Sequence, residues 1–182
     1  MRRVRWVALA FGLLACVWLV LLAMRAHERR QYPYGPSHSC DKGLMFALYE
    51  YAKDNDGRYP TGQETPEASL GLLYPKYANP GLLCGKMISA DVTAAQLEKG
   101  LPLTPETCGW HYVEGLTLDD DPGLAVFWDK ARLGHNGRRN ADWSTEVFFI
   151  GTNQDSISGS KWNDFLAGQK RLHAARDGRL PN

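Results

Sequence analysis

The hydrophobic pattern of the chain opens with an uninterrupted apolar run from Trp6 to Met24. Arginines flank this run on both sides, at Arg2, Arg3, Arg5, Arg25, Arg29 and Arg30. At about 1.5 Å per residue, a helix of this length spans roughly 28 Å, close to the hydrocarbon thickness of a bilayer. The pattern therefore predicts one membrane-spanning helix, whose anchoring residues include Trp6, Phe11, Trp18, Leu21 and Met24.

Three fates are open to this N-terminus. A cleavable signal peptide has a shorter apolar region that ends in small residues, whereas this run ends in Met24-Arg25-Ala26. A lipoprotein signal is an alternative because Leu13-Leu14-Ala15-Cys16 resembles a lipobox, but the eight residues after Cys16 stay apolar. The pattern favours the third fate, an uncleaved anchor over residues 1–30.

The orientation of the anchor depends on length more than on charge. Three arginines lie on each side of the run, so the positive-inside rule is nearly balanced. A short Arg-rich head before a first apolar segment is typical of proteins whose C-terminal part is exported. We expect a single-pass protein of a bacterial inner membrane with its C-terminal domain in the periplasm.

A Pro-rich linker over residues 31–38 separates the anchor from the rest, because Pro33 and Pro36 prevent a continuous helix. Helical spacing resumes with Ser39 as the expected N-cap. The apolar stripe of this second helix consists of Leu44, Ala47, Leu48, Tyr51 and Ala52. We expect the helix to end before Gly57, which can take the left-handed conformation.

The later pattern mixes short helices with strands. It predicts helices over 70–74, 91–99 and 160–172 and β-strands over 109–113, 123–128 and 146–151. A helix followed by antiparallel strands is an α+β order. We therefore expect one α+β domain over residues 39–182, in which a helix packs on a small antiparallel sheet.

Composition argues against nucleic-acid binding. Among the 182 residues, 44% are hydrophobic and 23% are charged, and the formal net charge is +1. A nucleic-acid-binding domain would show a basic face or stripe, which this chain lacks. We expect no nucleic-acid partner.

The stretch from Cys40 to Pro60 contains Tyr49-x-Tyr51-Ala52 followed by Asp54-x-Asp56-Gly57-x-Tyr59-Pro60. This stretch resembles the first helix of type IV pilin-like and pseudopilin-like proteins of the prepilin type. Two later segments, Leu82-Leu83-Cys84 and Gly109-Trp110-His111-Tyr112, are similar to the family's cysteine-containing segment and aromatic strand. The resemblance covers most of residues 40–168 and implies a pilin-like domain.

The chain departs from the family at its N-terminus. It lacks the Gly-Phe-Thr-Leu-x-Glu processing motif, and no acidic residue lies in the apolar run. The prolines of the linker also interrupt the helical spine that a filament subunit would use. The resemblance therefore implies a non-polymerising accessory subunit with a structural or interaction role, not an enzyme. Its expected partners are the lipid bilayer and other membrane or envelope proteins, and no cofactor is expected.

One loop carries candidate chemistry. Asp129, His135, Asn136 and Asn140 are residue types that can bind a metal or move a proton. Glycine-flanked loops also use such side chains to satisfy backbone groups, which is the structural interpretation. The alternative function is a small exported enzyme, or a metal- or ligand-binding module, that uses this loop.

Cysteines and aromatic residues give two further expectations. An exported domain meets an oxidising compartment, so we predict a disulfide between Cys84 and Cys108, with Cys40 reduced. The chain has more tryptophans and tyrosines than a small core needs. We expect Tyr32, Tyr34 and Trp143 at the surface, at an interface or the membrane boundary.

Overall fold

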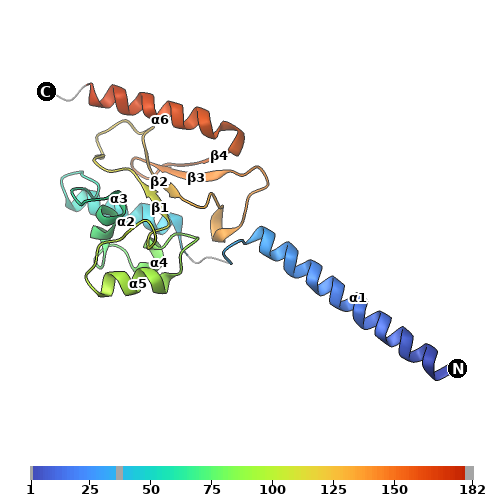
Figure 1. The fold of residues 1–182 in the computed structure, drawn as a ribbon. Coiled ribbons are helices and arrows are strands. Elements are labelled where there is room, and N and C mark those ends of the chain that lie inside the picture. The colour runs from blue at the N-terminus through green and yellow to red at the C-terminus, as the bar shows by residue number, and fades with distance from the viewer. Residues whose placement is uncertain (1, 36–38, 179–182) are drawn as a thin grey trace.

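A long N-terminal helix projects from a layered body in the computed structural model of the chain (Figure 1). The structure describes residues 2–35 and 39–178, without the side chains of residues 2–11 and of His135. Helix α1 (Arg2–Gln31) makes up the projection. All the strands and the other helices described here belong to the body.

Four strands form one antiparallel sheet in the described part of the chain, in the order β1-β2-β3-β4. They are β1 (Trp110–Tyr112), β2 (Ala125–Asp129), β3 (Thr145–Phe149) and β4 (Gln154–Ile157). Neighbouring strands are consecutive in sequence, so the sheet is a simple meander. The α+β expectation is confirmed, and so are the three predicted strands to within two residues at each end. Strand β4 was not predicted.

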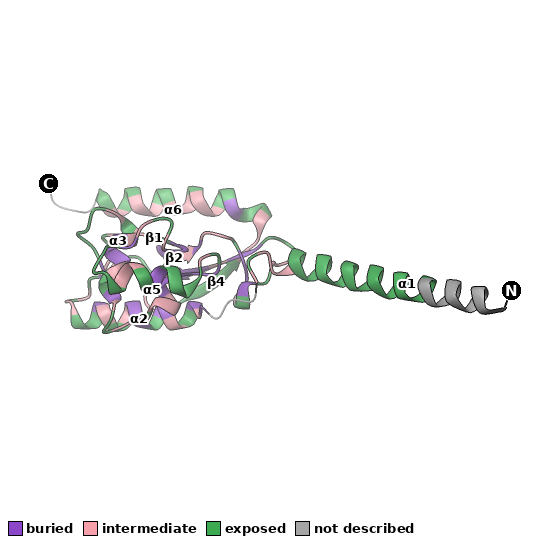
Figure 2. Cartoon of the chain, turned by 60° about the horizontal axis from the view of Figure 1, so that its bottom comes forward, coloured by how far each residue is buried: buried purple, intermediate pink, exposed green. Residues whose placement is uncertain are grey.

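A helix covers each face of this sheet (Figures 1 and 2). Helix α2 (Asp41–Asp54) packs on one face, where Phe127 and Phe148 stack with ring centroids 4.5 Å apart. Helix α6 (Trp162–Asp177) packs on the other face, against Ala125 and Val147. The two central strands, β2 and β3, supply apolar groups to both layers.

Short helices extend the layer that contains α2. They are α3 (Pro66–Leu70), the 3-10 turn η1 (Gly71–Leu73), α4 (Pro80–Leu83) and α5 (Ala90–Glu98). Two further 3-10 turns, η2 (His135–Gly137) and η3 (Gly159–Lys161), lie between and after the later strands. The helix expected over 70–74 begins earlier, because Thr65 caps it by accepting a hydrogen bond from the N–H of Ala68 at 3.2 Å.

The N-terminus of α2 also corrects an expectation. Cys40, not Ser39, is the N-cap, and its Sγ accepts a hydrogen bond from the N–H of Gly43 at 3.4 Å. Ser39 is instead buried beneath the helix start. At the other end, Gly57 takes the left-handed conformation (φ 78°) and its N–H bonds to the carbonyl oxygen of Ala52, as predicted.

The side chains of α1 over residues 12–30 lie open to solvent (Figure 2). Among the expected anchor residues, Trp18 is 64% exposed, Leu21 50% and Met24 63%. The side chains of Trp6 and Phe11 lie outside the described residues. Over the part of the chain that the structure describes, no helix is both long and apolar enough to cross a membrane.

Candidate functional site

The residues that the sequence suggested for chemistry have different surroundings. Asp129 is buried at the end of β2, whereas Asn136 is exposed and takes a positive φ of 59°. Asn140 donates its hydrogen bonds to the Oγ and carbonyl oxygen of Ser144. The side chain of His135 lies outside the described residues. The hydrogen bonds of Asp129 and Asn140 thus run to different partners, which favours the structural interpretation of this loop.

Asp129 belongs to a buried group of charges with Lys86 and Asp41. Its Oδ2 accepts the backbone N–H of Lys86 at 3.0 Å, and its Oδ1 accepts that of Ala131 at 2.6 Å. Lys86 in turn places its Nζ 2.5 Å from Oδ2 of Asp41, at the first turn of α2. Burial raises the pKa of Asp129 to about 6, although the nearby charge of Lys86 acts in the opposite direction.

This charge group is closed to solvent, which limits what it can do chemically. The Lys86 and Asp41 side chains are 0% and 2% exposed. The second oxygen of Asp41, Oδ1, has no hydrogen-bond partner among the described residues. No group of three or more histidine, cysteine or acidic side chains in the described chain is arranged to hold a metal. Without access for a substrate, the group is best interpreted as a structural ion cluster.

Cys84 and Cys108, the predicted disulfide pair, lie in adjacent segments. The N–H of Gly109 donates to the carbonyl oxygen of Cys84 at 2.9 Å, so the two cysteines flank one backbone contact. Both are buried free thiols in this structure. Burial raises the pKa of Cys84, and it raises the pKa of Cys108 to about 12. The disulfide therefore stays a prediction.

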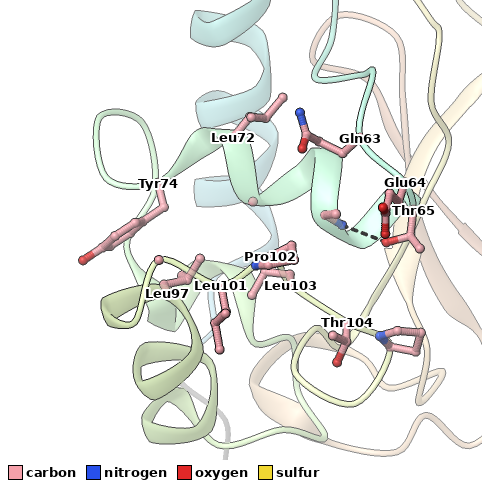
Figure 3. A pocket seen from close by; sticks show the side chains of 14 residues that line it. Gln63, Glu64, Thr65, Leu72, Tyr74, Leu97, Leu101, Pro102, Leu103 and Thr104 are labelled. Atoms are coloured by element: carbon pink, nitrogen blue, oxygen red, sulfur yellow. Dashed lines mark hydrogen bonds between the residues drawn. The ribbon is translucent and has the colours of Figure 1, made fainter.

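A cleft of about 550 Å³ lies beside α3 and α5 (Figure 3). Its apolar side carries Leu72, Tyr74, Leu97, Leu101 and Leu103. Its polar end carries Gln63, Glu64, Thr65 and Thr104. We call this feature the leucine cleft. Figure 3 shows its walls coming from three segments, which precede α3, follow it, and follow α5.

Hydrogen bonds fix the wall of the leucine cleft that follows α5. Gln96 on α5 donates to the carbonyl oxygen of Pro102 at 2.7 Å. Thr93 on the same helix donates to the carbonyl oxygen of Thr107 at 2.7 Å. The loop after α5 is thus fixed to the helix at two points, so the cleft is preformed.

The chemistry of the leucine cleft suits binding better than catalysis. Leu72 is 38% and Leu101 46% exposed, so apolar surface lies open at its mouth. Among its described lining residues, Glu64 is the one charged side chain. The hydroxyl of Thr65 already caps α3. An apolar floor with a few polar groups at one end fits an apolar side chain flanked by hydrogen-bond donors.

Sequence reasoning missed the leucine cleft and the buried lysine. The cleft comes from a loop-rich region without strong periodicity. Leu72 and Leu101 lie far apart in the sequence, and only the fold shows that both are exposed and line one cleft. No family model, curated protein or solved structure matches this chain.

Proposed function

We propose that the chain is a membrane-anchored accessory protein with an exported pilin-like domain, which binds another membrane or envelope protein through the leucine cleft. The observation that carries this proposal is the projecting helix α1. Its apolar side chains from Leu13 to Met24 are 40% or more exposed wherever a large one is described. Surface of this kind is strongly unfavourable in water, at about 25 cal/mol per Å².

A lipid bilayer is the environment that best fits the exposed apolar side chains of α1. The apolar run in the sequence begins at Trp6, ahead of the described side chains, and extends to Met24. Arginines come directly after it, at the level where headgroups would lie. The proposal places the anchor in an inner membrane and the domain that follows it in the periplasm.

The body supports the pilin-like part of the proposal at the level of arrangement. An amphipathic helix, α2, packs on a four-stranded antiparallel meander within the described residues. The break between α1, which ends at Gln31, and α2, which begins at Asp41, supports a non-polymerising role. A filament subunit would need one continuous spine there.

The leucine cleft supports an interaction role for the body. It is preformed, it carries exposed leucines, and its lining lacks a paired acid and base among the described residues. The alternative, an exported enzyme or metal-binding module at Asp129 and His135, has less support, because backbone N–H groups occupy both carboxylate oxygens of Asp129.

Membrane flotation of the full chain tests the anchor. We expect the wild-type chain to float with vesicles and to resist carbonate extraction. A Leu14→Glu, Leu21→Glu double variant should be released, because each charge within the apolar run costs about 2.5 to 3.5 kcal/mol. A Lys42→Glu variant in α2 is the control and should stay bound. Release of the wild-type chain by carbonate contradicts the proposal.

Photo-crosslinking in native membranes tests the leucine cleft. A photoreactive residue at position 101 should give a discrete adduct with a membrane or envelope protein. The control is position 92 on α5, since Val92 is 47% exposed, about as much as Leu101, but does not line the cleft. Equal adducts at both positions, or none at position 101, contradict the proposed binding role.

A further inference from the structure

The end of α1 contains a second concave site, which the proposed function does not use. Arg25, Glu28 and Arg29 lie on one face of the helix, and Tyr32 follows directly after its end, with its N–H bonded to the carbonyl oxygen of Glu28 at 2.8 Å. The chain then turns at Pro33 and Gly35, and the N–H of Gly35 donates to the carbonyl oxygen of Tyr32 at 3.0 Å. These residues line a pocket of about 420 Å³, which we call the juxtamembrane pocket.

The charges of the juxtamembrane pocket are open to a ligand. Arg25, Glu28 and Arg29 are exposed. Among the described residues, none forms a salt bridge with either arginine, and Glu28 is likewise outside the ion pairs found there. Two guanidinium groups four residues apart present a set of fixed donors that suits a phosphate group.

The position of the pocket along α1 selects the kind of phosphate. If Met24 marks the end of the apolar segment, Arg25 and Arg29 lie about 1.5 to 7.5 Å beyond it along the helix axis. That is the depth of the lipid headgroups, because headgroup layers extend a bilayer from about 30 to about 40–45 Å. This depth favours the phosphate of a lipid headgroup over a soluble phosphate.

The body adds positive charge and an aromatic side chain beside the pocket. The N–H of Arg139 donates to the carbonyl oxygen of Gln31 at 2.8 Å, which brings the loop between β2 and β3 to the end of α1. In this loop Arg138 is exposed, and the guanidinium of Arg139 lies 4.6 Å from the ring centre of Trp143. Trp143 is 56% exposed, and tryptophan is enriched at membrane interfaces.

We infer that the juxtamembrane pocket binds the headgroup of an anionic phospholipid of the phosphatidylglycerol type, an inference that rests on the proposed membrane anchor. Arg25 and Arg29 hold the phosphodiester, and Arg138 and Arg139 add a positive field. Glu28 accepts a hydrogen bond from a headgroup hydroxyl. The lipid thereby fixes the depth of the helix end and draws the domain toward the bilayer surface.

Native mass spectrometry of the detergent-solubilised full chain tests this inference. The probes are dioleoyl phosphatidylglycerol, phosphatidylcholine and phosphatidylethanolamine, with glycerol 3-phosphate as the soluble arm. We expect phosphatidylglycerol to bind about fivefold more tightly than phosphatidylcholine, because it carries one more net negative charge. Glycerol 3-phosphate should not be retained.

Variants assign the binding to the pocket. An Arg25→Gln, Arg29→Gln double variant should bind phosphatidylglycerol about thirtyfold more weakly. The control is Lys170→Gln with Arg171→Gln on α6, which removes the same charge from exposed positions away from the pocket and should leave binding unchanged. A Glu28→Gln variant should still bind phosphatidylglycerol, since an amide oxygen also accepts a hydroxyl.

Several results would overturn the inference. They are equal binding of phosphatidylglycerol and phosphatidylcholine, tighter binding of phosphatidylethanolamine with its loss in Glu28→Gln, retention of glycerol 3-phosphate, and an unaffected arginine double variant. Vesicle flotation separates these results from failure of the proposed function. A chain that floats with vesicles but binds phosphatidylglycerol and phosphatidylcholine equally overturns the pocket alone, whereas a chain that floats with neither neutral nor anionic vesicles overturns the anchor.

Discussion

Lys86 and Asp41 form an ion pair with 2.5 Å between Nζ and Oδ2, and neither side chain has more than 2% of its surface exposed. The ring of Trp110 lies beneath the ammonium group, 5.3 Å from it. Asp129 accepts the backbone N–H of the same lysine. Lys86 thus contacts two buried carboxylates, Asp41 at the first turn of α2 through its ammonium group and Asp129 at the end of β2 through its backbone N–H. Through these two contacts Lys86 connects helix α2 to the sheet.

Replacing Lys86 with methionine should therefore destabilise the protein strongly. The substitution leaves the Asp41 carboxylate buried without its cation and removes a positive charge near Asp129, and breaking a buried pair on one side costs about 3 to 5 kcal/mol. Urea unfolding of the domain at pH 7 measures the effect. The matched control is Lys76→Met, since Lys76 pairs with Asp54 at 2.8 Å but both are exposed. That exposed pair should contribute little, and equal losses in the two variants would contradict the role assigned to Lys86.

Stability should fall as the pH rises from about 4 to about 6. The pKa of Asp129 is raised from 3.8 to about 6 in the folded state, so the folded protein binds a proton in this window that the unfolded chain has released. The contribution of Asp129 is thus most favourable below pH 4, and roughly 3 kcal/mol of it is lost by pH 7.

The Asp129→Asn variant checks this pH dependence because it cannot ionise at that position. The unfolding free energy of the wild type minus that of the variant should therefore fall steadily from pH 4 to pH 7, because only the wild type loses stability. Urea unfolding at half-unit pH steps gives both curves. A difference that stays constant across the window, or that grows with pH, would show that Asp129 has no raised pKa in the folded state.

Gly109 should tolerate no side chain. A Cβ built on it would overlap the carbonyl oxygen of Cys84 and lie 3.0 Å from the Cα of Gly85, both backbone atoms. We expect Gly109→Ala to cost about 1 to 3 kcal/mol, as overpacking does. The control is Gly168→Ala in α6, where a Cβ meets only the flexible end of Arg171 at 3.9 Å. That change should stabilise the helix by about 0.5 to 1 kcal/mol, and thermal unfolding of both variants decides.

The predicted disulfide between Cys84 and Cys108 is testable by its products. If the domain is exported, non-reducing peptide mapping of protein from the envelope should recover the two cysteines in one linked pair. In protein kept reduced, both thiols should resist iodoacetamide at pH 8 until the domain unfolds, because burial raises the pKa of each. A bridge to Cys40, or rapid labelling of folded Cys108, would contradict the prediction.

The periodic elements could be predicted from sequence, and the polar ones could not. Helix α2 and strands β1 to β3 carry apolar residues at regular spacing, so their positions can be inferred from burial alone. Strand β4 is an edge strand whose Gln154, Asp155 and Ser156 are exposed. It exists because its backbone pairs with β3, and backbone pairing leaves no hydrophobic pattern.

The buried charges and the leucine cleft escaped prediction for a related reason. A lysine after Cys84-Gly85 is expected to lie at the surface, and Lys86 is buried only because partners 45 and 43 residues away reach it. The leucine cleft likewise joins segments that precede α3 and follow α5. Both depend on long-range contacts, which a single sequence does not reveal.

The hydrogen bond from Arg139 to Gln31 has a consequence for how the domain faces its surroundings. A single bond of this kind contributes about 1 kcal/mol, less than twice thermal energy. The helix can therefore set the height of the domain above a bilayer without fixing its rotation about the bilayer normal. A partner that diffuses in the membrane plane would then set this rotation when it binds the leucine cleft.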